Sequence, residues 1–178
     1  MSDKNNQIHL GLDIGSISIN TVLMDANASI LESRYDFCHG KPFELLKTIL
    51  TDIEKKYTKE RIGIVGFTGT GGKLGASLIG GEHVNEIVAQ SSSVAKLYPQ
   101  VKTIMEMGGE DSKLIFMEQI DESASRLAEF ELNTLCAAGT GSFLDQQAKR
   151  IGISIENEFG ELSLLSEKPP RIAGRCSV

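Results

Sequence analysis

The sequence contains one short pattern twice, 93 positions apart. Residues 12–16 read Leu-Asp-Ile-Gly-Ser, and residues 105–109 read Met-Glu-Met-Gly-Gly. Each copy places an acid between two apolar residues and a glycine directly after them. Because side chains alternate along a strand, we expect each acid on the face opposite its apolar neighbours, where the strand runs into a turn. Two such strand ends predict two units of similar design.

The glycine that follows each acid, Gly15 or Gly108, permits a positive φ, which would turn backbone N–H groups outward as a nest for an anion. The two acids, Asp13 and Glu106, each beside such a nest, suit a hydrated Mg²⁺ and a polyphosphate held between them. Either turn alone is more simply a tight hairpin with an incidental acid, since Gly-Ser and Gly-Gly are ordinary hairpin residues. The matched pair favours nucleotide chemistry.

Apolar periodicity predicts an α/β protein in which a similar plan occurs twice. Strands are expected over residues 8–14, 17–24, 30–37, 62–67, 101–107, 113–117 and 127–132, and helices over 43–57, 87–98, 141–151 and a short stretch before Pro169. Pro99 follows the second helix and marks the expected boundary. The first lobe then covers residues 1–99, and the second covers residues 100–178.

Residues 66–74, GFTGTGGKL, look like another phosphate motif, the Walker A loop. No glycine stands five positions before Gly72, and Leu74 replaces the hydroxyl residue that would contact Mg²⁺. The spacing therefore argues against a Walker A loop. The two acid–glycine turns remain the better candidates for binding phosphate.

Composition narrows the class of protein. The chain has 24 acidic and 18 basic residues and a formal charge of −6, so it has no diffuse attraction to nucleic acid or to an anionic membrane. The N-terminus lacks an apolar signal core, and no apolar run approaches the roughly 20 residues that span a bilayer. We expect a cytoplasmic protein without a nucleic-acid or membrane partner. Three widely spaced cysteines argue against a disulfide framework.

Several segments together resemble a known family. They are residues 11–20 (GLDIGSISIN), 84–90 (VNEIVAQ), 103–115 (TIMEMGGEDSKLI), 135–152 (LCAAGTGSFLDQQAKRIG) and 171–178 (RIAGRCSV). The acid–glycine turns resemble those of the actin-like ATPase superfamily, and the whole set is similar to the BadF/BadG/BcrA/BcrD family. This family contains activators of 2-hydroxyacyl-CoA dehydratases and ATPase subunits of benzoyl-CoA reductases. The resemblance implies an actin-like ATPase (ribonuclease H-like) fold, with two lobes that each have a mixed sheet flanked by helices.

The resemblance also implies the chemistry. In this family ATP hydrolysis drives one electron from a [4Fe–4S] cluster to a partner enzyme at very low potential. The partner would be a 2-hydroxyacyl-CoA dehydratase-type enzyme or domain, and the electron donor a ferredoxin or flavodoxin. The cluster is shared across a homodimer, and its matching ligands here are Cys136 and Cys176. Since a four-thiolate cluster needs four cysteines, a two-fold axis would supply them from two per chain. Cys38 is expected to be a small buried residue.

The same resemblance assigns individual residues. Asp13 and Glu106 would orient Mg²⁺, Asp13 through water. The nucleotide, ATP or ADP, would contact Gly11, Gly15, Ser16, Gly108, Gly109, Gly139 and Gly141. Glu86 would face the nucleotide, or it merely complements the dipole of the helix that it begins. Glu110 would act as a general base, or it is only a turn residue.

Three positions depart from the commonest family pattern. Asn20 stands where activators usually have lysine, Glu110 where they have glutamine, and Ser142 where they have arginine. At these positions the sequence is more similar to the ATPase segment of large fused dehydratase-activator proteins than to the short stand-alone activators. Family members continue beyond the position of Val178, so we expect a truncated second lobe, weak nucleotide binding and an inactive isolated segment.

Two other functions remain open at this point. The first is a small-molecule kinase of the same superfamily, which would tolerate replacement of the cysteines. The second is a nucleotide-binding module without turnover, which would hold ATP and release no phosphate.

Overall fold

The structure, a computed structural model, describes residues 7–133 and 140–170. The chain divides into two compact units, Met1–Val94 and Ala95–Val178. The division falls within helix α3 (Glu86–Leu97). The boundary expected from the sequence, Pro99, lies a few residues later. Each unit is described by itself.

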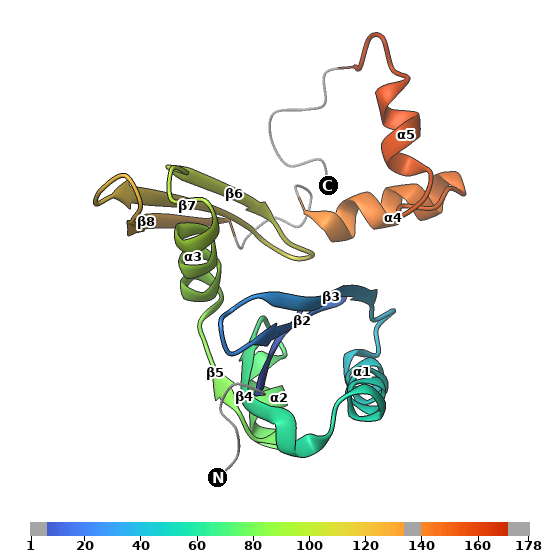
Figure 1. The fold of residues 1–178 in the computed structure, drawn as a ribbon. Coiled ribbons are helices and arrows are strands. Elements are labelled where there is room, and N and C mark those ends of the chain that lie inside the picture. Colours follow the sequence, from blue (N-terminus) through green and yellow to red (C-terminus); the bar gives the residue numbers. More distant parts are fainter. Residues whose placement is uncertain (1–6, 134–139, 171–178) are drawn as a thin grey trace. The chain divides into compact units, whose positions relative to one another are not determined.

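The first unit is built on a five-stranded mixed sheet with strand order β3-β2-β1-β4-β5 (Figure 1). Its strands are β1 (Ile8–Ile14), β2 (Ser18–Asp25), β3 (Ile30–Phe37), β4 (Ile62–Thr68) and β5 (Glu82–His83). The first three strands form antiparallel hairpins, whereas β4 pairs in parallel with β1 and β5 pairs in parallel with β4. Its other elements are helix α1 (Pro42–Lys56), a short 3₁₀ turn (Lys59–Arg61) and helix α2 (Gly72–Ile79).

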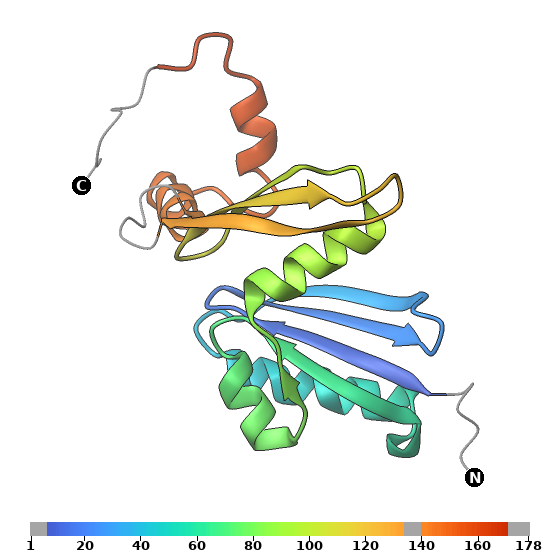
Figure 2. The ribbon, with the colours of Figure 1, turned by 90° about the vertical axis from the view of Figure 1, so that its left-hand side faces the viewer.

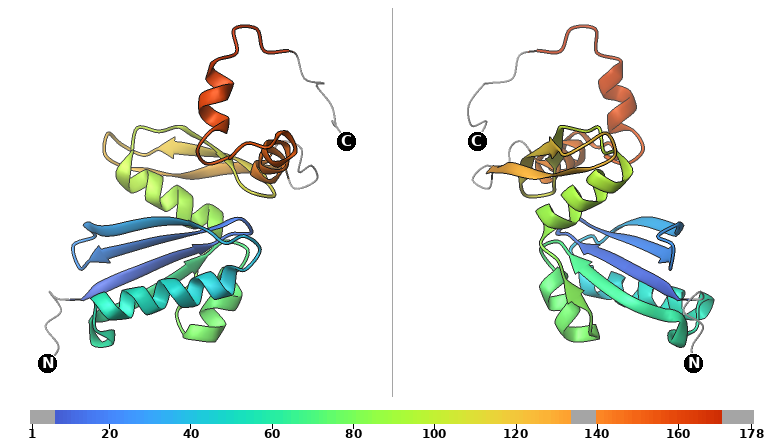
Figure 3. Two further views of the ribbon diagram at one scale, coloured as in Figure 1. Left: turned by 90° about the vertical axis from the view of Figure 1, so that its right-hand side faces the viewer. Right: turned by 60° about the vertical axis from the view of Figure 1, so that its left-hand side comes forward.

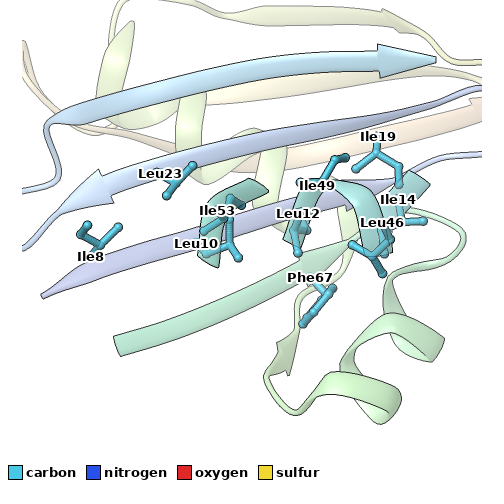
Figure 4. Close-up of a cluster of buried hydrophobic side chains, with 10 residues drawn as sticks. All are labelled: Ile8, Leu10, Leu12, Ile14, Ile19, Leu23, Leu46, Ile49, Ile53 and Phe67. Atoms are coloured by element: carbon cyan, nitrogen blue, oxygen red, sulfur yellow. The ribbon is translucent and has the colours of Figure 1, made fainter. Parts of the chain in front are cut away.

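Helices α1 and α2 cover the same face of this sheet (Figures 2 and 3). Along β1 every second residue is buried, and these residues point toward the two helices. The resulting core contains Ile8, Leu10, Leu12, Ile14, Ile19, Leu23, Leu46, Ile49, Ile53 and Phe67 (Figure 4). The other face of β1 is therefore left to Asp13 and its neighbours.

The second unit contains a three-stranded sheet with strand order β6-β7-β8. Its elements are β6 (Thr103–Met107), β7 (Ser112–Gln119), β8 (Ser125–Asn133), α4 (Gly141–Ile151) and α5 (Phe159–Leu164). Both strand pairs are antiparallel. Of the two mixed sheets that the family resemblance implied, the first is mixed, and the second has only antiparallel pairs across the described residues.

The predicted strands and helices lie where periodicity placed them, but the sequence did not predict α2 or β5. Helix α2 contains Gly72 and Gly75, which lower intrinsic helix propensity. Tertiary packing explains its position. A Cβ at Gly75 would lie 2.7 Å from Ile14 Cδ1, so only a residue without a side chain lets the helix lie this close to β1. Among residues 7–133 and 140–170, no helix combines the length and the apolar character needed to cross a membrane.

Candidate functional site

The first acid, Asp13, lies near the end of β1 and is half-buried, while Leu12 and Ile14 on either side of it are buried. This alternation is the one that the sequence predicted. Asp13 is directly opposite Asn20 on β2. The Asn20 side-chain amide donates a hydrogen bond from Nδ2 to Asp13 Oδ2 over 3.2 Å. The acid thus has a fixed but uncharged partner.

The second acid, Glu106, has the equivalent place on β6 and is opposite Lys113 on β7. Lys113 Nζ donates to Glu106 Oε2 at 2.7 Å and to Asp111 Oδ1 at 2.8 Å. The Lys113 side chain is 4% exposed, whereas those of Glu106 and Asp111 are 24% and 32% exposed, so these charge-assisted bonds join a buried cation to partly exposed carboxylates. In both hairpins the acid is bonded to the residue seven positions later.

The glycine after each acid closes the turn in the same way. The Gly15 N–H donates to the Ser18 carbonyl, and the Gly108 N–H donates to the Asp111 carbonyl, each over 2.9 Å. The expectation that these glycines take positive φ is wrong, since neither is among the positive-φ glycines of the described residues. Instead, the absence of a side chain at each glycine lets atoms across the turn approach it closely. A Cβ at Gly15 would lie 3.2 Å from the Ser18 carbonyl oxygen, and one at Gly108 would lie 2.9 Å from Asp111 Oδ1.

The carbonyl groups of the two turns are held by other segments. In the first turn, Cys38 donates from Sγ to the Ser16 carbonyl at 3.1 Å and from its backbone N–H to the Ile17 carbonyl at 2.9 Å. Cys38 is buried, as the sequence predicted. In the second turn, the first N–H groups of α4, from Gly141 and Ser142, donate to the carbonyls of Gly108 and Gly109. In each turn two successive carbonyls are therefore engaged.

The N–H groups at the tips of the turns are not engaged in this way. Across residues 7–133 and 140–170, those of Ser16 and Ile17 in the first turn, and of Gly109 and Glu110 in the second, have no hydrogen-bond acceptor. Adjacent unshared N–H groups on a tight turn are suited to binding an anion. The candidate donors thus begin one residue later than the sequence suggested, because the glycine N–H closes the hairpin.

The sequence missed a third segment at the first acid. The loop from Thr68 to Gly72, whose spacing argued against a Walker A loop, folds back against β1. Its Gly71 N–H donates to the Ile14 carbonyl at 2.8 Å, and a Cβ at Gly69 would lie only 2.3 Å from Asp13 Oδ1. The sequence signal was a glycine-rich loop at the end of a predicted strand. Assigning it to Asp13 required knowing that β4 pairs in parallel with β1.

The face of the sheet around Asp13 has few side chains. Gly11 on β1 is the register partner of Gly66 on β4, and Asp13 is the partner of Thr68. The Thr68 hydroxyl is buried and has no hydrogen-bond partner among the described residues. A bare backbone, a carboxylate and an unused donor are features that suit a hydrated Mg²⁺ with its phosphate ligand. The residues present in the first unit therefore fit this group.

The remaining predicted site residues are less informative. Glu86 is the half-buried first residue of α3, and Glu110 is exposed at the tip of the second turn. The N–H of Gly141 is used by Gly108, so a phosphate contact through this N–H would compete with that bond. Gly139, Cys136 and Cys176 lie outside the described residues. Within the described ranges, no group of three or more His, Cys, Asp or Glu side chains is placed to hold a metal directly.

This α/β fold with acid–glycine hairpins is that of the actin-like ATPases. The model of the BadF/BadG/BcrA/BcrD ATPase family matches residues 10–178, and the chain belongs to this family.

Two characterised relatives illustrate the match. The 2-hydroxyisocaproyl-CoA dehydratase activator of Clostridioides difficile is 29% identical over 170 residues, which cover 95% of this chain and 61% of the relative. The (R)-2-hydroxyglutaryl-CoA dehydratase activating ATPase of Acidaminococcus fermentans is 27% identical over 172 residues, which cover 95% of this chain and 63% of the relative.

A solved structure of the activator of the 2-hydroxyisocaproyl-CoA dehydratase from Clostridium difficile, with bound ADPNP, matches with a TM-score of 0.78 and 29% identity. The match covers 96% of this chain and 61% of that one. The chain therefore spans less than two thirds of the length of these relatives.

Proposed function

We propose that this chain is the nucleotide-binding part of an ATP-hydrolysing activator of a 2-hydroxyacyl-CoA dehydratase-type enzyme or domain. The observation that carries the proposal is the repeated hairpin, in which an acid, a closing glycine and two unshared tip N–H groups recur with the same hydrogen bonds. Membership of an ATPase family supports it, as do relatives named as dehydratase activators.

In this proposal Asp13 and Glu106, each in its own hairpin, would accept hydrogen bonds from water bound to Mg²⁺, and the tip N–H groups of each hairpin would donate to phosphate oxygens. When bound, Mg²⁺ supplies positive charge that offsets the charge of the polyphosphate. The two acids contribute differently. Asn20 leaves the charge of Asp13 uncompensated, whereas Lys113 compensates one of the two carboxylates that it contacts. Asp13 therefore keeps its full negative charge for the hydrated metal, and in the second turn one charge of the Glu106–Asp111 pair remains uncompensated beside that of Glu110.

The electron-transfer half of the proposal rests on the family resemblance. Cys136 and Cys176 of two chains would ligate one [4Fe–4S] cluster, and the homodimer would carry it. A ferredoxin or flavodoxin would be the electron donor and the dehydratase the acceptor, and hydrolysis of ATP by water to ADP and phosphate would accompany the transfer. The cluster supplies a one-electron carrier of low potential.

Nucleotide binding is tested by calorimetric titration of the chain with ATP, with and without Mg²⁺. Asp13→Asn and Glu106→Gln keep the size of each side chain and remove its charge. We expect each to weaken Mg²⁺-dependent binding by about tenfold or more, equivalent to about 1.4 kcal/mol. Glu129→Gln, an exposed acid on β8, is the matched control and should have no effect. Unchanged binding in Asp13→Asn would contradict the proposal.

The cluster is tested by anaerobic reconstitution with iron and sulfide. Wild-type protein should bind iron, absorb broadly in the visible range and elute as a dimer. Cys136→Ser and Cys176→Ser should each lose the colour, and Cys38→Ser, at a buried position in the other unit, should retain it. A chain that transfers the γ-phosphate of ATP to a small molecule and tolerates both cysteine replacements would instead be a kinase.

A further inference from the structure

The Asp13 carboxylate is constrained on two sides by different means. On one side Asn20 donates to Oδ2 at 3.2 Å. On the other side Oδ1 faces Gly69, where a Cβ would lie 2.3 Å away. Real Cβ atoms do not approach an oxygen so closely. Within the described part of the chain Oδ1 accepts no hydrogen bond.

We infer that Gly69 is a positioning residue for Asp13. Because Gly69 lacks a side chain, the carboxylate can keep one orientation, in which Oδ2 accepts the hydrogen bond from Asn20 and Oδ1 has no hydrogen-bond partner among the described residues. For nucleotide binding this inference rests on the proposed function, since the unshared Oδ1 is the atom that would accept a hydrogen bond from metal-bound water. The orientation of the Asp13 carboxylate can be tested in the protein without nucleotide or Mg²⁺.

The neighbours of Gly69 explain why the loop cannot move aside. Gly71 donates to the Ile14 carbonyl at 2.8 Å, and Gly72 donates to the Gly69 carbonyl at 2.9 Å. A Cβ at Gly69 would also lie 2.7 Å from the Ile14 carbonyl oxygen. The loop is thus bonded to the strand that carries Asp13. An added methyl group must therefore displace the carboxylate or break the contact between the loop and β1.

A simpler explanation is that Gly69 is required only for its φ of +81°, which residues with side chains rarely adopt. Gly80 provides a matched control, because its φ is +86° and an added Cβ would meet nothing within 4 Å. If φ alone mattered, Gly69→Ala and Gly80→Ala would behave alike.

The experiment is a double-mutant cycle of Gly69→Ala with Asp13→Ala, read by urea unfolding in the absence of nucleotide. We expect Gly69→Ala to lower the unfolding midpoint more than Gly80→Ala does. In the Asp13→Ala background the loss caused by Gly69→Ala should shrink, because the carboxylate is no longer there to be displaced, while the part due to the Ile14 carbonyl group, whose oxygen and carbon would lie 2.7 and 2.9 Å from the added Cβ, should remain. An equal loss in both backgrounds would overturn the inference.

If Gly69→Ala alone fails to fold, the double variant decides. Recovery of folding on adding Asp13→Ala supports the inference. Continued failure would show that contact with the Ile14 carbonyl group, rather than with Asp13, requires glycine at position 69, and would overturn the inference.

A second measurement separates this inference from the proposed function. Titrating Mg²⁺ at fixed ATP, we expect Gly69→Ala to raise the half-saturating Mg²⁺ concentration by about tenfold, while Gly80→Ala leaves it unchanged. Coupling in the unfolding cycle without any Mg²⁺ shift would support the positioning of Asp13 and count against Asp13 as the magnesium-orienting acid. Absence of both effects would overturn the inference.

Discussion

The two acid–glycine hairpins share their hydrogen bonds and differ in what surrounds them. In the first, Leu12 and Ile14 beside the acid are 2% and 0% exposed. In the second, Met105 and Met107 at the equivalent positions are 85% and 63% exposed. The hairpin geometry therefore does not depend on burial of the flanking residues. The bonds that recur in both hairpins, from the residue opposite the acid and from the closing glycine, join residues that are close in sequence.

The difference in burial follows from strand pairing. Strand β1 pairs with β2 on one edge and with β4 on the other, and helices α1 and α2 cover its apolar face. Across the described residues β6 pairs with β7 alone. The comparison predicts that equivalent substitutions will have unequal effects in the two hairpins. Two experiments test this directly, and two more test contacts that only the first hairpin makes.

The largest expected effect is in the core. Ile14→Ala should lower the free energy of unfolding by about 3 kcal/mol, because it empties a fully buried position. Met107→Ala, at the equivalent place in β6, should change it by less than about 0.5 kcal/mol. Both are measured by denaturant unfolding. A cost above about 1.5 kcal/mol for Met107→Ala would indicate that this face is covered in solution.

The next effect concerns the partners of the acids. Lys113→Met should destabilise the protein by about 2 kcal/mol, since it leaves Glu106 and Asp111 close together without their shared cation. Asn20→Ala removes one neutral hydrogen bond and should cost about 1 kcal/mol. Lys149→Met breaks only an exposed pair with Asp145 and serves as the control. Equal costs for the Lys113 and Asn20 variants would refute the asymmetry.

A smaller effect should follow from loosening the first turn. Cys38→Ala removes the thiol that donates to the Ser16 carbonyl and should cost about 1 kcal/mol, whereas Cys38→Ser keeps a donor and should cost less. Thermal unfolding measures both. If the alanine and serine variants are equally destabilised, the Sγ contact does not hold the turn, and the backbone bond of Cys38 alone does so.

The smallest expected effect on stability has the opposite sign. Thr68→Val removes a buried hydroxyl that has no partner among the described residues, so the free protein should gain about 0.5 kcal/mol. The same variant should weaken Mg²⁺-dependent nucleotide binding if the hydroxyl serves the ligand, and Thr68→Ser should restore it. Stabilisation without any loss of binding would leave Thr68 with no role in the site.

Much of this molecule was predictable from local sequence. The alternation in residues 8–14 predicted both β1 and the side on which Asp13 lies, and helix α4 begins at Gly141 as expected. Helix α2 was not predictable, because its glycines are tolerated only through contact with Ile14 and Phe67. The turn glycines were identified correctly but for the wrong reason, since their N–H groups close the hairpins.

The sequence by itself determined the two acid–glycine turns and the strands that lead into them, because those features depend on alternation and on hydrogen bonds between near neighbours. Only the tertiary structure decided that Gly69 limits the position of Asp13 and that Thr68 lies beside it. Parallel pairing of β4 with β1 brings together residues that are far apart in sequence, and no local pattern encodes that contact.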